Sequence, residues 1–139
     1  MARTIIEAVR DELRRSDAPL VSAYLFGSQA SERAHADSDV DVAVLFDRRA
    51  APDAVDRSRR ALRLAGDLIA ATHVNRVDVV PLNDAPAELA ARALREGIRV
   101  LCRDDQADHA FTRRTLLLAA DLAPFLRRIR RLKLAAITS

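Results

Sequence analysis

The sequence predicts an α/β sandwich in which helices cover a small mixed sheet. Segments with apolar residues at helical spacing alternate along the chain with short, strongly apolar segments, and this alternation is typical of α/β folds. The chain has 139 residues, of which 50% are hydrophobic. That is enough for one domain with a hydrophobic core and too few for two. We therefore expect a single domain over residues 1–139.

Each element is bounded by its own local signals. Ile5, Val9 and Leu13 recur at helical spacing, and Pro19 marks the break before the first strand. Gly97 stands just past the end of a later helix that has a proline in its first turn. The expected strands cover 21–26, 39–46, 76–82 and 98–102, and the expected helices cover 3–15, 53–71, 86–96 and 108–133, with a short turn or helix after Gly27.

The helix expected over residues 53–71 is amphipathic. Its apolar stripe consists of Val55, Leu62, Ala65 and Ile69, and arginines and aspartates lie opposite. A surface helix of this kind turns its apolar stripe toward the core.

Composition excludes several classes of protein. The N-terminal segment is charged and helical in period, unlike a secretory signal, and the single cysteine, Cys102, excludes an internal disulfide, so we expect a cytoplasmic protein. The longest apolar run, residues 116–126, is too short to span a membrane. His35, His73 and His109 are far apart in the sequence, which argues against a zinc site.

Two carboxylates share one face of the second strand. Side chains alternate along a strand, so Asp39 and Asp41 point the same way and lie roughly 6 to 7 Å apart. Such a pair could be a solvated surface feature, but it begins a strongly apolar strand, where solvated charges are not expected. Because like charges repel, a divalent cation between them would stabilise the pair. Oxygen ligands suit Mg²⁺ or Mn²⁺, and Mg²⁺ is normally shared with substrate phosphates.

The Gly-Ser pair before this strand fits a phosphate-bearing substrate. Gly27 follows a strand, where glycine allows close approach of the backbone to a ligand, and the N–H groups that follow attract anions. Ser28 adds a hydroxyl donor. Taken alone, the pair also fits a plain turn.

A third carboxylate lies within another apolar strand. Asp78 is flanked by valines, so it is either an edge-strand charge that discourages aggregation or a partner of Asp39 and Asp41. In the second case it would act as a base or a metal ligand, and the three carboxylates could hold two metal ions that clamp a displacement at phosphorus.

These residues together resemble a known family. The segments GSQASERAHADSDVDVAVLF, RVDVVPLNDAP and REGIRVLCRDD are similar to the polymerase-β-like nucleotidyltransferases, most of all to the minimal MNT-type members, which are antitoxins paired with HEPN-domain toxins. The resemblance covers nearly the whole chain. It implies a nucleotide cradled by Gly27 and Ser28, magnesium held by Asp39 and Asp41, and Asp78 as a third carboxylate that helps to activate the attacking hydroxyl. It also implies adenylyl transfer from ATP onto a tyrosine of the toxin, which would silence the toxin's RNase activity.

The chain departs from the family pattern at one place. Members often carry Arg-Gly where this chain has Ser31 and Glu32, which weakens the expected grip on the triphosphate, although Arg33 is next in sequence and could substitute. Two other functions stay open. One is a small-molecule nucleotidyltransferase of the aminoglycoside type, which normally needs a further domain for its acceptor, and the other is an antitoxin that acts by binding alone.

The helix expected over residues 108–133 carries two apolar seams. We expect one of them to be covered by another chain, either a second subunit or an all-helical toxin, since so large an exposed patch is otherwise a liability. The alternative is that the small domain buries both. Pro124 should kink the helix and tilt its basic end away from the core. We expect that basic end to be a solvated rim that does not bind nucleic acid. The first seam is Phe111, Leu118, Leu122, Phe125, Ile129 and Leu132, and the second seam is Leu116, Ala119, Ala123 and Leu126.

Overall fold

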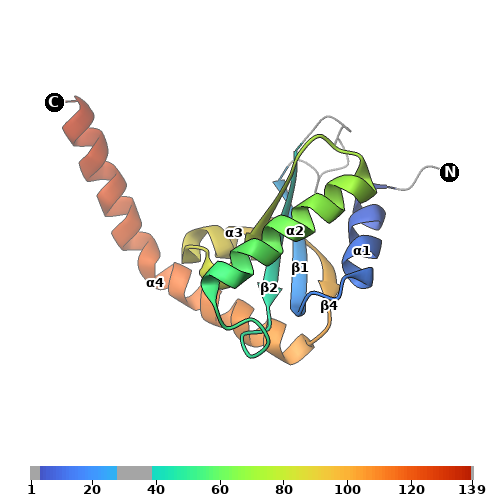
Figure 1. Ribbon diagram of the computed structural model, residues 1–139. Coiled ribbons are helices and arrows are strands. Elements are labelled where there is room, and N and C mark those ends of the chain that lie inside the picture. The colour runs from blue at the N-terminus through green and yellow to red at the C-terminus, as the bar shows by residue number, and fades with distance from the viewer. Residues whose placement is uncertain (1–3, 28–38, 139) are drawn as a thin grey trace.

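The computed structural model describes residues 4–27 and 39–138, and it has a mixed four-stranded sheet with helices on both faces (Figure 1). The strands lie in the order β3-β2-β1-β4; β1 is antiparallel to β2 and to β4, whereas β2 and β3 are parallel. This architecture confirms the predicted fold class. The strands are β1 (Leu20–Phe26), β2 (Val40–Phe46), β3 (Val77–Pro81) and β4 (Ile98–Cys102), and the helices are α1 (Ile5–Arg15), α2 (Ala54–Thr72), α3 (Ala87–Glu96) and α4 (Asp105–Thr138), with a short 3₁₀ helix, η2, over Leu82–Asp84.

Side-chain alternation along β2 divides the core into two layers. Val40, Val42 and Val44 are fully buried in a cluster with residues of α1 and α2, while Ala43 and Leu45 belong to a second cluster with residues of α3. Hence α1 and α2 cover one face of the sheet, and α3 and the start of α4 cover the other. By the same alternation, the aspartate of β2 is on the α3 side of the strand.

The predicted inward face of α2 is wrong. Val55, Leu62 and Ile69 are 58%, 75% and 38% exposed, and the buried residues of the helix are instead Arg57, Ala61, Leu64 and Leu68. The two stripes are neighbours on the helix. Hydrophobicity alone favoured the exposed stripe, because the buried stripe contains Arg57. The charge of Arg57 is balanced by Asp84 through a bidentate ion pair with N–O distances of 2.9 and 2.7 Å.

Helix α4 begins earlier and ends later than predicted. Its first turns are tied to the sheet by the buried carboxylate of Asp108, which accepts hydrogen bonds from the hydroxyls of Ser22 and Tyr24 at 2.6 and 2.5 Å and from the Arg99 guanidinium at 3.0 Å. The helix contains Pro124, and Figure 1 shows that it changes direction along its length, so that its last turns project from the body of the molecule.

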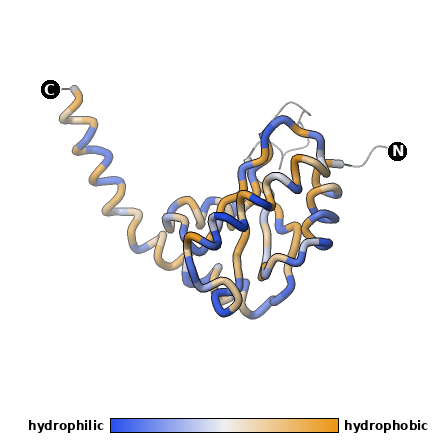
Figure 2. The backbone as a smooth tube through the Cα atoms, viewed as in Figure 1, coloured by the Kyte–Doolittle hydropathy of each residue, from blue (hydrophilic) through white to orange (hydrophobic). Residues whose placement is uncertain are grey.

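The two predicted seams of α4 have different environments. The second seam is half-buried throughout, consistent with the packing of α4 against α3. In the first seam Phe111 packs on the core, but Leu118, Phe125 and Leu132 are 51%, 59% and 63% exposed. Figure 2 shows hydrophobic residues recurring among hydrophilic ones along the projecting part of the helix.

The basic end of α4 is exposed, as expected, but it makes one ion pair with the domain. Arg130 forms an ion pair with Glu88 of α3, which links the distal part of α4 back to the domain. Arg130 and the other basic residues there are all exposed. No helix in the described ranges is both long and apolar enough to cross a membrane.

Candidate active site

The sheet brings two of the predicted site carboxylates side by side. Asp41 of β2 is in register with Asp78 of β3, and residues paired in this way point to the same face of a sheet whose strands are about 4.8 Å apart. Asp39 comes two residues before Asp41, just ahead of the first residue of β2, and its charge acts on the Asp41 carboxyl. The pairing of β2 with β3 therefore places Asp78 beside Asp41, one of the two aspartates that it was expected to join.

Asp41 is under electrostatic strain. Burial, and then the negative charges of Asp78 and Asp39, raise the pKa of the Asp41 carboxyl above its ordinary value, while Arg76 opposes the shift. A positive charge brought between these carboxylates would relieve the repulsion that raises this pKa.

Arg76 also belongs to the site, although it was not predicted from the sequence. Its guanidinium forms an ion pair with Asp78 at 3.4 Å, although both side chains are substantially exposed. Its backbone carbonyl accepts a hydrogen bond from the N–H of Val40 at 3.0 Å, which helps to dock the start of β2 on β3. The available signal was its spacing of two residues from Asp78, which puts both side chains on one face of the strand.

Gly27 is required by its position next to Asp41. It has a φ of +81°, and a Cβ atom there would lie 2.5 Å from Oδ2 of Asp41. Any other residue would therefore meet both backbone strain and a direct clash with the carboxylate. The glycine was predicted for close approach to a ligand, and the structure adds that it leaves room for a site side chain. Ser28 and Arg33, the other predicted nucleotide contacts, lie outside the described residues, as do Ser31 and Glu32.

A pocket of about 460 Å³ adjoins the carboxylates. Asp41, Arg76 and Asp78 line it together with Phe26 and Leu62. Polar groups gathered beside an apolar wall in a cavity of this size are typical of small-ligand sites.

The donor set fits a hard divalent cation. The acidic side chains supply only carboxylate oxygens, which Mg²⁺ and Mn²⁺ prefer, and the negative charges of Asp78 and Asp39 add to the effect of burial in raising the pKa of Asp41. Within residues 4–27 and 39–138 no three acidic, histidine or cysteine side chains are already close enough together to hold a metal ion. The metal assignment of Asp39, Asp41 and Asp78 therefore stays a prediction.

The fold and the paired carboxylates define a nucleotidyltransferase domain. The family model "Polymerase beta, Nucleotidyltransferase" matches residues 7–106, and the chain belongs to this family. No curated protein sequence matches the chain at a comparable level of significance.

Several solved structures share the fold over nearly the whole chain. A crystal structure of a toxin–antitoxin with AMP-PNP contains a chain with 25% identity and a TM-score of 0.68, and the match covers 96% of this chain and 98% of that one. The toxin–antitoxin MntA–HepT and a complex of a tri-AMPylated Shewanella oneidensis HEPN toxin with MNT antitoxin each match with 23% identity, a TM-score of 0.63 and 97% coverage of both chains. The chain thus has the fold of a minimal MNT-type nucleotidyltransferase.

Proposed function

We propose that this chain is an antitoxin that transfers AMP from ATP to a tyrosine hydroxyl of a cognate HEPN RNase toxin and thereby neutralises it. The observation that carries the proposal is the register pairing of Asp41 with Asp78, beside Asp39 and the space left by Gly27. The chain that is 25% identical comes from a toxin–antitoxin complex with an ATP analogue, which supports both the nucleotide and the class of partner.

In the proposed reaction Asp78 acts as the general base. It accepts the proton of the tyrosine hydroxyl, whose oxygen then forms a bond to the α-phosphorus of ATP, and the bond from that phosphorus to the pyrophosphate oxygen breaks. Arg76 holds the Asp78 carboxylate through its ion pair, so it is a positioning residue. Because the reaction consumes ATP, we place the protein in the cytoplasm.

Asp39 and Asp41 are the proposed ligands of Mg²⁺, or Mn²⁺ in its place, and Asp78 is the third. When bound, the ion supplies positive charge for the phosphate oxygens. Gly27, Ser28 and Arg33 are the proposed contacts to the nucleotide. Of these, Gly27 has the observed role of leaving space beside Oδ2 of Asp41.

The first seam of α4 is the proposed contact surface for the toxin or for a second subunit. Its exposed leucines and phenylalanine recur at intervals of four, three and seven, the spacing with which helices pair. The second seam already packs within the domain, which leaves the exposed part of the first seam, from Leu118 onward, available to another chain.

The test is a transfer assay with ATP labelled at the α-phosphate. Incubation with Mg²⁺ and the co-expressed toxin should label the toxin, and ATP labelled at the γ-phosphate should not. Label on an aminoglycoside and none on the toxin would favour the small-molecule transferase. A complex that silences the RNase with no label transferred would favour an antitoxin that acts by binding alone.

A further inference from the structure

A second, larger pocket lies at the opposite end of β2 from the carboxylates. It has a volume of about 640 Å³ and lies between the end of β2, the loop that follows it and the first turns of α4. Its wall reaches Phe46, five residues along the strand from Asp41, which corresponds to roughly 16 Å of extended chain. The pocket is therefore separate from the candidate active site.

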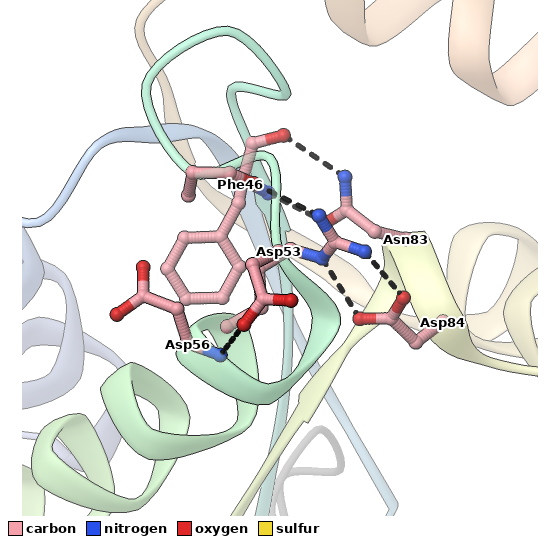
Figure 3. A network of polar contacts seen from close by, with 7 residues as sticks. Phe46, Asp53, Asp56, Asn83 and Asp84 are labelled. Atoms are coloured by element: carbon pink, nitrogen blue, oxygen red, sulfur yellow. Dashed lines mark hydrogen bonds and ion pairs between the residues drawn. The ribbon is translucent and has the colours of Figure 1, made fainter.

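One wall of this pocket is rigid. Asn83 receives a hydrogen bond from the backbone N–H of Phe46 at 2.9 Å and donates one to its carbonyl at 3.0 Å (Figure 3). Arg57, which is 8% exposed, donates to Asp84 and to the carbonyl of Ala51. These bonds fix the start of α2, η2 and the end of β2 relative to one another, so the wall exists before any ligand binds.

The pocket has an excess of positive charge. Arg48, Arg49 and Arg114 line it, and in the described part of the chain no hydrogen bond or ion pair holds their guanidinium groups. The ion pair with Arg57 lowers the pKa of the Asp84 carboxyl, and the nearby charge of Arg48 adds a smaller effect in the same direction.

The acidic residues of the lining accept hydrogen bonds from backbone N–H groups that are two or three residues away in the sequence. Asp47 accepts a hydrogen bond from the N–H of Arg49 at 2.9 Å, and Asp104 accepts one from the N–H of Ala107 at 3.0 Å. These bonds turn each carboxylate toward its own backbone, which leaves the arginines to face an incoming anion.

Apart from the polar Gln106, the remaining lining is apolar and partly aromatic. Val21, Leu45 and the half-buried ring of Phe111 supply it. A ligand that satisfies both parts needs a flat apolar group and a strongly anionic one, in a volume that suits small molecules. We propose that this pocket binds a nucleoside phosphate, with its phosphate held by Arg48, Arg49 and Arg114 and its base against Phe111. The proposal is independent of the reaction proposed for the carboxylates.

Titration of the ¹⁵N-labelled protein with AMP in EDTA buffer tests this site. The expected result is saturable change at backbone amides of residues 45–49 and 104–114. Changes confined to the surroundings of Gly27, Asp41 and Asp78, or no saturable change at millimolar AMP, would overturn the proposal. Ribose 5-phosphate, which has the phosphate of AMP but lacks its base, tests the contribution of the base. It should bind more weakly than AMP, and equal affinity would overturn the assignment of the base to Phe111.

Neighbouring arginines provide the matched control. Arg113 and Arg114 are both exposed on α4, but only Arg114 lines the pocket. Arg114→Gln should weaken AMP binding by about tenfold, the worth of one charge-assisted hydrogen bond, whereas Arg113→Gln should leave it within about twofold. Equal losses in the two variants would mean that AMP responds only to net charge, and the pocket would then not be its site. Arg49→Gln should behave like Arg114→Gln.

Discussion

Gly27 shows how one backbone position can limit a whole site. Its φ of +81° and the 2.5 Å approach that a Cβ would make to Asp41 mean that Gly27→Ala must strain the turn and displace the carboxylate. We expect a loss of about 1–2 kcal/mol in the free energy of unfolding and a large loss of nucleotide transfer. Urea unfolding and the labelled-ATP assay measure the two effects.

Gly66 is the control for this substitution. It lies inside α2, and among the described residues, leaving aside its chain neighbours and the backbone of its own helix, no heavy atom comes within 4 Å of the position that an added methyl group would take. Gly66→Ala should therefore stabilise the helix by up to about 1 kcal/mol and leave transfer unchanged. If both alanine variants transfer AMP like the wild type, Gly27 does not shape the site.

The raised pKa of Asp41 predicts a pH-dependent stability. Since folding raises this pKa, protonation favours the native state, and that contribution is present below the unfolded-state pKa and lost as the pH rises through the folded-state value. Asp41→Asn cannot ionise. Without metal at about pH 7 it should therefore be more stable than the wild type, by less than about 1 kcal/mol because the site is half-exposed.

Urea titrations at several pH values measure this difference, which should vanish below the ordinary pKa of an aspartate. Asp67→Asn, on the exposed side of α2, should show no such gain. Asp41→Asn should also remove nucleotide transfer, as should Asp39→Asn. Transfer within tenfold of the wild type in either variant would contradict their assignment as metal ligands.

Asp78 should matter more for turnover than for ATP binding. A general base acts on the acceptor hydroxyl in the transition state and contributes typically about 10²- to 10⁴-fold. Asp78→Asn should lower the maximal rate of transfer by this factor with little change in the ATP concentration needed for half-maximal rate. A variant that lost ATP affinity but kept its maximal rate would make Asp78 only a binding residue.

At the scale of elements, the two seams of α4 predict different outcomes. Leu118 is 51% exposed, so Leu118→Glu should leave the free energy of unfolding within about 0.5 kcal/mol of the wild type and weaken association with the partner. Leu126 is half-buried, so Leu126→Glu should instead destabilise the domain itself. Thermal unfolding and co-purification with the toxin distinguish these effects. If Leu118→Glu co-purifies as well as the wild type, the interface lies elsewhere.

Strands and helices were predictable because apolar periodicity is a local property. The period of two along β2 predicted which residues share a face, and the structure places Val40, Val42 and Val44 in one core cluster and Ala43 and Leu45 in the other. Asp41 and Asp78 lie side by side because β2 pairs with β3 in one particular register, and periodicity does not specify which strands pair or in which register. Local hydrophobicity failed on α2, because the buried stripe contains Arg57, whose burial depends on the distant Asp84.

At the scale of the whole molecule, one buried carboxylate joins the first strand to the last strand and the last helix. Asp108, which is 4% exposed, accepts hydrogen bonds from Ser22 and Tyr24 of β1 and from Arg99 of β4. Burial, together with the hydrogen bond to Asp108, raises the pKa of Tyr24 to about 12. The cluster was not predicted, because its members are up to 86 residues apart in sequence. It sets the point from which α4 leaves the sheet, and therefore where the first seam is presented.

Removing this carboxylate should affect both stability and the partner. Asp108→Ala leaves buried hydroxyls and an arginine without their acceptor, so we expect a loss of about 2–4 kcal/mol in the free energy of unfolding and weaker association through α4. Tyr24→Phe removes a single hydrogen bond and should cost only about 0.5–1.5 kcal/mol. Asp105→Asn, at a side chain that is 88% exposed, is the control and should change little. Urea unfolding and co-purification measure the series, and an Asp108→Ala variant as stable as Asp105→Asn would show that α4 is held by its apolar contacts alone.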